Sequence, residues 1–430
     1  MHHFDYRPAL GGAAELYCED VRLADIAEAV GTPVYVYSTA TLRRHFSVFR
    51  DALSAALPGR KLLVAYAVKA NSNLSVLKTL AELGGGADTV SEGEVRRALA
   101  AGVPPERIVF SGVGKTDAEL AFALETGIAE INIESEPELD RLSRVATQLG
   151  RSVEIAIRVN PDVGAGGHAK ISTGKTETKF GVSLMEAERL YAKAARTPGV
   201  KPVGLATHIG SQITDLAPLA EAFATLRALA ERLRAEGLEV KRLDLGGGLG
   251  VPYFNAPEPP GPAAYAAMVA KALEGFDCEL AFEPGRVIVA NAGVLLSRVV
   301  HIHERPGNEG RRFMVLDAAM NDLIRPTLYE AYHEIVPVVR RAAEALPYDV
   351  VGPVCETGDI FTKARALAPQ VAGDLMAFLS AGAYGAVMAS EYNSRPLVPE
   401  VLVNGSDWAV VRRRPTLDEM LAREPLAGWL

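Results

Sequence analysis

The sequence predicts an α/β protein, a (β/α)8 barrel of the TIM type followed by a second, β-rich domain. Two observations predict the barrel: from about residue 60, eight short runs of strand-forming residues alternate with helical stretches, and a polar residue follows nearly every run. After about residue 287 the pattern changes to short β segments separated by turn-rich loops, which predicts the second domain. We therefore expect the barrel over residues 38–286, and a β-rich domain formed by residues 1–37 and 287–430.

The elements follow in order along the chain. A strand over Pro33–Tyr37 and a helix over Thr39–Leu57 come first, and periodicity alone leaves their domain ambiguous. Helices are expected between the barrel strands, for example over Leu74–Leu83 and Pro137–Leu149. The eight predicted strands, the number that closes this kind of barrel, are Lys61–Ala67, Gly86–Val90, Arg107–Phe110, Ala129–Ile133, Val153–Val159, Lys201–Thr207, Arg242–Leu245 and Glu279–Phe282.

An open, doubly wound sheet is the alternative that a count of strands leaves open. The polar residues at the strand ends favour the barrel, because the carboxyl ends of barrel strands converge on one mouth, where active sites form. These residues are Lys69, Asp88, Ser111, Glu134, Asn160, His208, Gly246 to Gly248 and Glu283.

The β-rich region is predicted from β-branched and aromatic runs bounded by turn residues. The β segments expected after the barrel are Val287–Val289, Val294–Val300, Arg312–Leu316, Gln370–Leu379 and Ala409–Arg413.

A separate loop, Asp162–Lys179, is rich in Gly, Thr and Lys and is long enough to suggest a function.

Composition excludes several classes of function. A net charge of −8, with Arg412–Arg414 as the one short basic run, argues against nucleic acid as a partner. The N-terminus lacks the apolar stretch of a signal peptide and no run of about 18 apolar residues occurs, so we expect a cytoplasmic protein without a membrane anchor. Three cysteines without CxxC spacing indicate neither a disulfide framework nor a zinc site.

Three motifs resemble known binding sites but fit them poorly. The segment from Ser111 to Thr116 lacks the first glycine of a nucleotide P-loop, because Val109 stands there. Gly246 to Gly250 fails the dinucleotide fingerprint, since Val251 takes the place of the last glycine, but it remains a plausible anion-binding loop. His301 and His303 share one face of a strand without a third ligand nearby, so no metal site is expected.

Four features together indicate a pyridoxal 5′-phosphate site. Lys69, at the end of an apolar strand, can form an imine with an aldehyde. The backbone amides of Gly246 to Gly248 can approach a phosphate. Glu283 offers a carboxylate to a protonated pyridine nitrogen, and His208 offers a flat face for stacking.

With these residues the chain resembles the fold type III pyridoxal-phosphate decarboxylases over nearly its whole length. Among them it is most similar to those that act on diaminopimelate. The stretches that carry the resemblance are Tyr66–Asn71, Val90–Glu94, Ile131–Leu139, His168–Val182, Thr207–Ile213, Leu243–Tyr253, Glu283–Arg286, Cys355–Phe361 and Ala381–Pro396.

The resemblance implies a role for each site residue. It implies that Lys69 carries the cofactor, that His208 and Cys355 are also catalytic, and that Cys355 protonates the α-carbon. It further implies a homodimer in which Cys355 and Glu356 reach the neighbouring subunit's site. The implied cofactor-binding residues are Lys69, Asp88, His208, Ser211, Gly248, Glu283, Gly285, Arg286 and Tyr384, and the implied substrate-binding residues are Arg286, Arg325, Tyr329, Glu356 and Tyr384.

The substrate expectation is the conversion of meso-diaminopimelate to L-lysine and carbon dioxide, the last step of lysine synthesis. Two arginines and an acid suit a substrate with a second carboxylate and amine, since guanidinium binds carboxylate and carboxylate binds ammonium. Glu356 stands where ornithine decarboxylases typically carry aspartate. The alternatives are a related enzyme acting on carboxynorspermidine, ornithine or a D-amino acid, and an inactive homologue that regulates a partner.

Overall fold

The computed structural model describes the chain except residues 1, 10–12, 165–172, 175–177, 254–257 and 305–310. Much of the predicted loop Asp162–Lys179 therefore lies outside the described residues. The chain divides into two compact units, one of Arg43–Pro252 and Pro257–Ile288, the other of Met1–Leu42, Tyr253–Ala256 and Val289–Leu430.

The first unit is a closed barrel of eight parallel strands, so the predicted fold is confirmed and the open sheet is excluded. Closure comes from the pairing of the last strand with the first, Leu280 opposite Leu62. The strands are β5 (Leu62–Ala67), β6 (Gly86–Thr89), β7 (Ile108–Phe110), β8 (Glu130–Ile133), β9 (Val153–Arg158), β10 (Val200–Ala206), β11 (Arg242–Asp244) and β12 (Glu279–Phe282).

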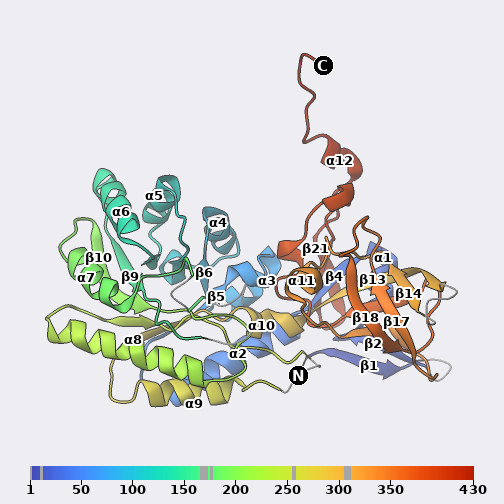
Figure 1. Cartoon of the computed structure of the whole chain (residues 1–430), viewed down its shortest axis with the longest axis horizontal. Helices are drawn as coiled ribbons and strands as arrows, with labels where there is room; N and C mark the ends of the chain where they lie inside the picture. Colours follow the sequence, from blue (N-terminus) through green and yellow to red (C-terminus); the bar gives the residue numbers. More distant parts are fainter. Residues whose placement is uncertain (1, 10–12, 165–172, 175–177, 254–257, 305–310) are drawn as a thin grey trace. The chain divides into compact units, whose positions relative to one another are not determined.

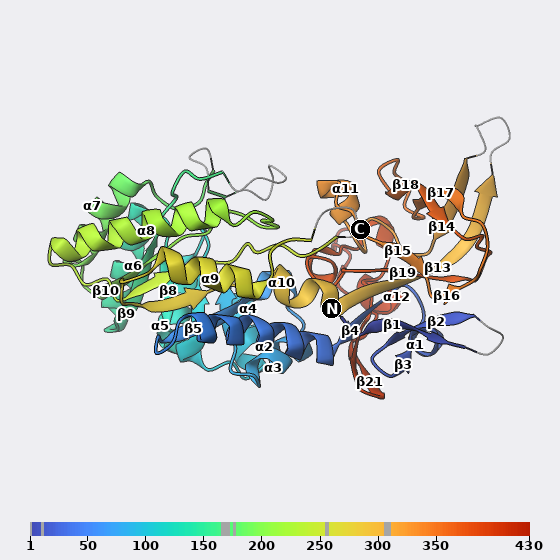
Figure 2. The same ribbon diagram turned by 90° about the horizontal axis from the view of Figure 1, so that it is seen from below.

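Helices lie outside these strands (Figures 1 and 2). Several begin at a serine or threonine whose side chain accepts a backbone N–H of the first turn: Ser91, Thr116, Ser135 and Ser183. Their ends are therefore encoded locally, and the predicted helices match closely. The helices are α2 (Thr39–Ala56), α3 (Leu74–Ala81), α4 (Glu92–Ala100), α5 (Asp117–Thr126), α6 (Glu136–Leu149), α7 (Leu184–Ala194), α8 (Ala217–Ala235), α9 (Pro262–Ala272) and α10 (Arg286–Val289).

The second unit is β-rich, as predicted. Its larger sheet runs in the order β18-β17-β14-β13-β4-β20-β21, with β19 and β15 attached, and a smaller sheet contains β1, β2, β3 and β16. The strands are β1 (Phe4–Pro8), β2 (Ala14–Cys18), β3 (Val21–Arg22), β4 (Val34–Ser38), β13 (Gly293–Glu304), β14 (Arg312–Leu316), β15 (Ile335–Pro337), β16 (Val339–Arg340), β17 (Leu346–Val351), β18 (Ile360–Leu367), β19 (Leu375–Phe378), β20 (Glu400–Asn404) and β21 (Asp407–Arg412).

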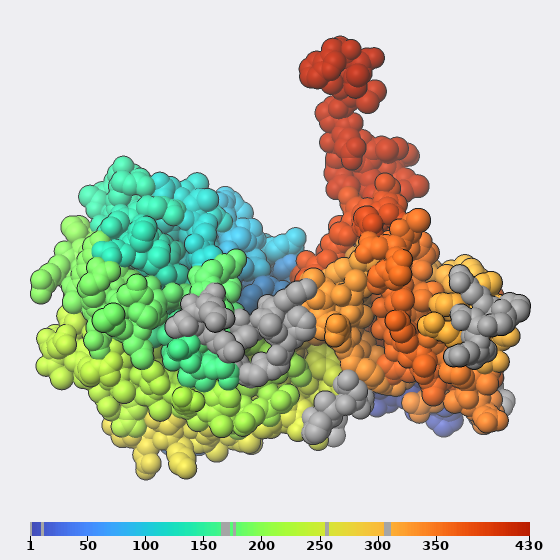
Figure 3. Space-filling model, in the orientation of Figure 1, coloured from blue at the N-terminus to red at the C-terminus, as the bar shows by residue number. Residues whose placement is uncertain are grey.

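Within the described residues, the second unit also contains the α-helices α1 (Leu23–Val30), α11 (Arg325–Tyr329) and α12 (Leu417–Leu421). The strand predicted over Pro33–Tyr37 is β4, which lies between β13 and β20 and therefore belongs to this unit. After β21 the C-terminal segment stands out from the sheet of its own unit, and Trp429 is 88% exposed (Figure 3).

One predicted strand is wrong. Val287–Val289 belongs to the helix α10, not to a strand. Ile288 and Val289 are buried there, and this tertiary packing overrides the strand propensity of a short β-branched run.

No helix among the described residues is long and apolar enough to cross a membrane.

Candidate active site

Lys69 lies directly after β5, in the short helix Val68–Ala70. Its Nζ is 2.9 Å from Oδ2 of Asp88, a fully buried residue of β6. The pairing of β5 with β6 sets Ala67 opposite Asp88, so the sheet register itself brings the two side chains together. The structure thus places an ammonium and a carboxylate at one end of the barrel.

Glu283 follows β12 and faces the same interior. Burial raises the pKa of its carboxyl well above the usual value, and the charges of Asp244 and Asp88 raise it further, while Lys69 opposes them. Its Oε1 is buried and has no hydrogen-bond partner among the described residues. A buried oxygen of this kind is expected to meet a donor from a bound molecule.

His208 follows β10, and its Nδ1 accepts a hydrogen bond of 3.2 Å from the backbone N–H of Gly247. Burial lowers the pKa of the imidazole well below its usual value, and the nearby charges of Lys69 and Arg158 lower it further. The ring is therefore neutral at physiological pH and offers an uncharged flat face.

The backbone conformation and the close packing of the loop Gly246 to Gly248 favour glycine at each position. Gly246 and Gly248 have φ of +62° and +112°, in the region that favours glycine. A Cβ on Gly247 would lie 2.2 Å from the carbonyl oxygen of Glu283. The loop backbone is therefore packed closely against the end of β12, with its amides near His208.

Arg286 and Ser211 lie together in the same unit. The guanidinium of the buried Arg286 donates to Oγ of Ser211 at 3.1 Å from Nη2 and 3.3 Å from Nε. Gly248 contacts the segment before Ser211, because a Cβ on Gly248 would lie 2.6 Å from the carbonyl oxygen of Gly210. The predicted phosphate ligands of the barrel thus gather beside the glycine loop.

A cavity of about 410 Å³ lies at this mouth of the barrel. Lys69, His208 and Glu283 line it together, so these three predicted strand-end residues converge on one cavity. Its remaining lining includes Ser111, Asn132, Arg158, Thr173 and Phe180.

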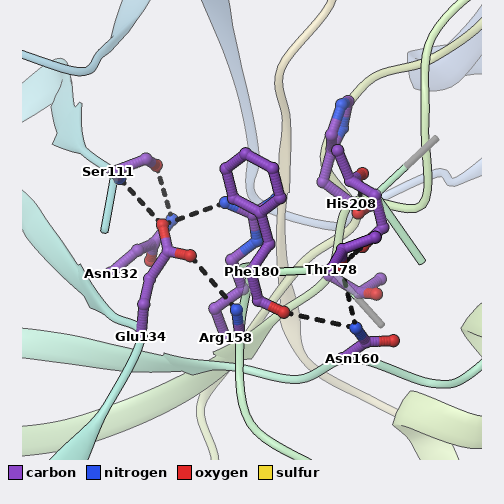
Figure 4. A network of polar contacts seen from close by, with 12 residues as sticks. Ser111, Asn132, Glu134, Arg158, Asn160, Thr178, Phe180 and His208 are labelled. Atoms are coloured by element: carbon purple, nitrogen blue, oxygen red, sulfur yellow. Dashed lines mark hydrogen bonds and ion pairs between the residues drawn. The ribbon is translucent and has the colours of Figure 1, made fainter. Parts of the chain in front are cut away.

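A polar network includes Asn132 and Arg158, which line the cavity (Figure 4). Glu134 is its centre: it accepts hydrogen bonds from Nη1 of Arg158 at 2.9 Å and from the backbone N–H groups of Gly112 at 2.9 Å and Gly181 at 3.2 Å. The guanidinium of Arg158 also lies over the ring of Phe180, 4.8 Å from its centroid. Glu134 thereby connects the loops that contain Gly112 and Gly181 to strand β9, which contains Arg158.

Arg158, Asn132 and Asp244 are site residues that the sequence did not reveal. All three belong to the strands themselves and do not follow them. A polar or charged residue at a buried strand position, such as Arg158 at the end of Val153–Arg158, is the signal that could have found them.

The structure describes two of the weak motifs. Nζ of Lys115 is bound by Glu138 at 2.7 Å and by the carbonyl oxygens of Gly112 and Asn132, so this buried lysine is structural. His301 and His303 are exposed on β13, and no group of three potential metal ligands occurs in the described part of the chain.

Five predicted site residues lie in the β-rich unit. Cys355 is exposed, and its backbone N–H donates to Oδ1 of Asn393 at 3.0 Å. The carboxylate of Glu356 is hydrogen-bonded to Tyr392, whose pKa it raises. The other three are Arg325, which is buried with Nη1 2.8 Å from Nε2 of His333, and the half-buried Tyr329 and Tyr384.

The residues of the barrel fit pyridoxal phosphate. The glycine loop has no space for side chains and offers backbone amides to a phosphate. Oε1 of Glu283 has no hydrogen-bond donor among the described residues, and Lys69 supplies an amine. Barrel and site together define a pyridoxal-phosphate-binding enzyme of the (β/α)8 class.

Comparison with known proteins narrows this class. Residues 39–290 match the family model described as pyridoxal-dependent decarboxylase, pyridoxal binding domain. A curated diaminopimelate decarboxylase from Zymomonas mobilis is 51% identical, covering 96% of this chain and 98% of that protein, and one from Pseudomonas aeruginosa is 49% identical over 99% of both. The chain belongs to the diaminopimelate decarboxylase family of pyridoxal-dependent decarboxylases, which confirms the predicted resemblance.

Solved structures agree. The diaminopimelate decarboxylase from m. jannaschi has a TM-score of 0.93 at 34% identity, covering 99% of this chain and 98% of that one. The Helicobacter pylori enzyme, complexed with L-lysine, has a TM-score of 0.88 at 41% identity, covering 93% of this chain and 98% of that one.

Proposed function

We propose that the protein decarboxylates meso-diaminopimelate to L-lysine and carbon dioxide, as the last step of lysine synthesis. The observation that carries the proposal is the near-full-length match to diaminopimelate decarboxylases, at about half identity, in a chain that retains Lys69, Glu283 and His208 around one cavity.

The cofactor supplies an electron sink for the pair of electrons left when the carboxylate departs as carbon dioxide. Within the barrel, Lys69 would hold its aldehyde carbon and Glu283 would accept a hydrogen bond from its ring nitrogen through Oε1. The neutral face of His208 would stack on the ring, and Asp88 would hold the amine of Lys69 in place.

The phosphate of the cofactor would be held by the amides near Gly248, by Ser211 and by the segment from Gly285 to Arg286, with Tyr384 as a further donor. The glycine backbone and the Ser211–Arg286 pair support this assignment, because both present N–H or O–H donors from closely packed positions.

Residues of the β-rich unit complete the proposed reaction. Cys355 delivers a proton to the α-carbon after carbon dioxide leaves. Arg325, with Arg286, pairs with substrate carboxylate, and Glu356 with Tyr329 binds the distal ammonium. The protein acts as a homodimer in which Cys355 and Glu356 serve the partner's site; the exposure of Cys355 supports this part. A cytoplasmic location and domain boundaries at residues 38 and 286 remain predictions.

Substrate choice is the direct test. Purified protein with pyridoxal phosphate is given meso-diaminopimelate, ornithine, carboxynorspermidine or a D-amino acid, and carbon dioxide and the amine product are measured. We expect lysine from meso-diaminopimelate at a rate far above that from any other substrate, and none from Lys69→Ala. A preference for ornithine would contradict the proposal, and absence of any turnover would favour the inactive regulatory homologue.

A further inference from the structure

Asp244 is a buried acid that the proposed reaction does not use. It is the last residue of β11 and is 1% exposed. Its Oδ1 accepts a hydrogen bond of 2.9 Å from the backbone N–H of Gly246, and its Oδ2 lies 3.4 Å from Nδ2 of Asn132. Its carboxyl group is also hydrogen-bonded to that of Glu283. One side chain thus contacts both the glycine loop and Glu283.

Strand register produces this contact. β11 pairs with β12 so that Asp244 lies opposite Ala281. Glu283 is two residues further on and therefore points to the same side of the sheet. The backbone N–H of Glu283 also donates to the carbonyl oxygen of Gly246 at 2.8 Å. The two carboxyl groups are held together by the barrel itself.

The charges around this pair decide where its proton lies. Two carboxylates in contact away from water repel each other, so the pair retains one proton. Burial raises the pKa of Asp244, and the hydrogen bond donated by Glu283 opposes this rise. The groups that face the pair are Asp88 from β6, Lys69 after β5, Glu130 and Asn132 from β8, and Tyr265 from α9.

We propose that Asp244 is a positioning residue that fixes the glycine loop and shares a proton with Glu283, so that Glu283 presents its other oxygen to the ring nitrogen of the cofactor. The inference rests on the proposed function, because it requires that cofactor. Asp244 sets both the direction of Glu283 and the pH at which Glu283 can carry a negative charge.

The test uses the isosteric variant Asp244→Asn. Asparagine keeps an acceptor for the N–H of Gly246 but removes the negative charge that raises the pKa of Glu283. The dissociation constant of pyridoxal phosphate is measured against pH without substrate, by absorbance and fluorescence. Wild-type affinity falls on the acid side as the pair takes up a second proton. In Asp244→Asn only Glu283 remains to take up a proton, so we expect this acid limb to move by about one pH unit.

Two further variants complete the design. Asp244→Ala loses both this charge and the bond to Gly246, so at pH values above the acid limb we expect a dissociation constant roughly tenfold higher than that of the wild type. Glu138→Gln is the control, since this buried carboxylate of the same barrel is bound to Lys115 at 2.7 Å, and we expect an acid limb like that of the wild type.

The outcomes separate the two proposals. If Asp244→Asn binds pyridoxal phosphate as tightly as the wild type and its acid limb does not move, the positioning role is overturned and the proposed function is left intact. Failure of the wild-type protein to bind pyridoxal phosphate would overturn both. Thermal melting of each variant checks the fold, and the Asn variant keeps the test informative if the Ala variant does not fold.

Discussion

At the scale of single residues, position in a strand decided what the sequence could reveal. Lys69, His208 and Glu283 were predicted because each stands directly after an apolar run, and such residues meet at the barrel mouth. Arg158 and Asp244 lie within β9 and β11, and whether a strand residue faces the barrel interior or the helices depends on register. That register comes from pairing between distant strands.

His208 gives a prediction about pH. Its pKa is lowered in the folded protein by burial, by Lys69 and by Arg158, so below pH about 6.5 the unfolded chain binds a proton here that the folded chain does not. This difference lowers the stability of the wild type as the pH falls through that value. In His208→Gln the thermal midpoint should therefore fall less between about pH 7 and pH 5.5.

Melting curves at several pH values measure this difference. His301→Gln is the matched control, because His301 is exposed on β13 and its loss should leave the wild-type slope unchanged. Parallel curves for the wild type and His208→Gln would show that His208 is not the group responsible.

At the scale of elements, local signals predicted the barrel better than the β-rich unit. Each barrel strand is a short buried run between helices, several of which carry their own N-caps, so pattern and structure agree. Eight strands of the β-rich unit were not predicted, including three in the first forty residues, where only Pro33–Tyr37 was expected: β1, β2, β3, β15, β16, β17, β18 and β20. Strands of a mixed sheet are stabilised by neighbours far away in sequence, which a single-sequence pattern does not contain.

The glycine loop gives a prediction at this scale. In Gly247→Ala the new Cβ would lie 2.2 Å from the carbonyl oxygen of Glu283, so the loop or the end of β12 must shift. We expect a loss of about 1–3 kcal/mol in the free energy of unfolding and weaker binding of pyridoxal phosphate. Gly261→Ala is the control, since nothing lies within 4 Å of its added Cβ. Equal stability and cofactor affinity in both variants would contradict the tight packing of the loop.

At the scale of the whole molecule, closure of the barrel was predictable because the count of eight strands and the polar residues at the strand ends favour the same architecture, a closed barrel. The division into two units was suggested by the change of pattern near residue 287, and the structure divides the chain at Val289. The assembly of two chains bears on the proposed function, because two proposed catalytic groups belong to different units: Lys69 to the barrel and Cys355 to the β-rich unit.

Mixed dimers test the proposed sharing of sites. Lys69→Ala and Cys355→Ala are each expected to lose nearly all activity, because one removes the cofactor-holding amine and the other the proton donor. If a site combines Lys69 of one chain with Cys355 of its partner, a dimer of the two variants contains one intact site and one doubly damaged site. Random mixing of equal amounts makes half of the dimers mixed, and one of the two sites in each mixed dimer is intact. About a quarter of the wild-type activity should therefore return. Mixing each variant with itself is the control. If both residues came from one chain, every site of the mixed dimer would lack one group, and mixing would restore nothing.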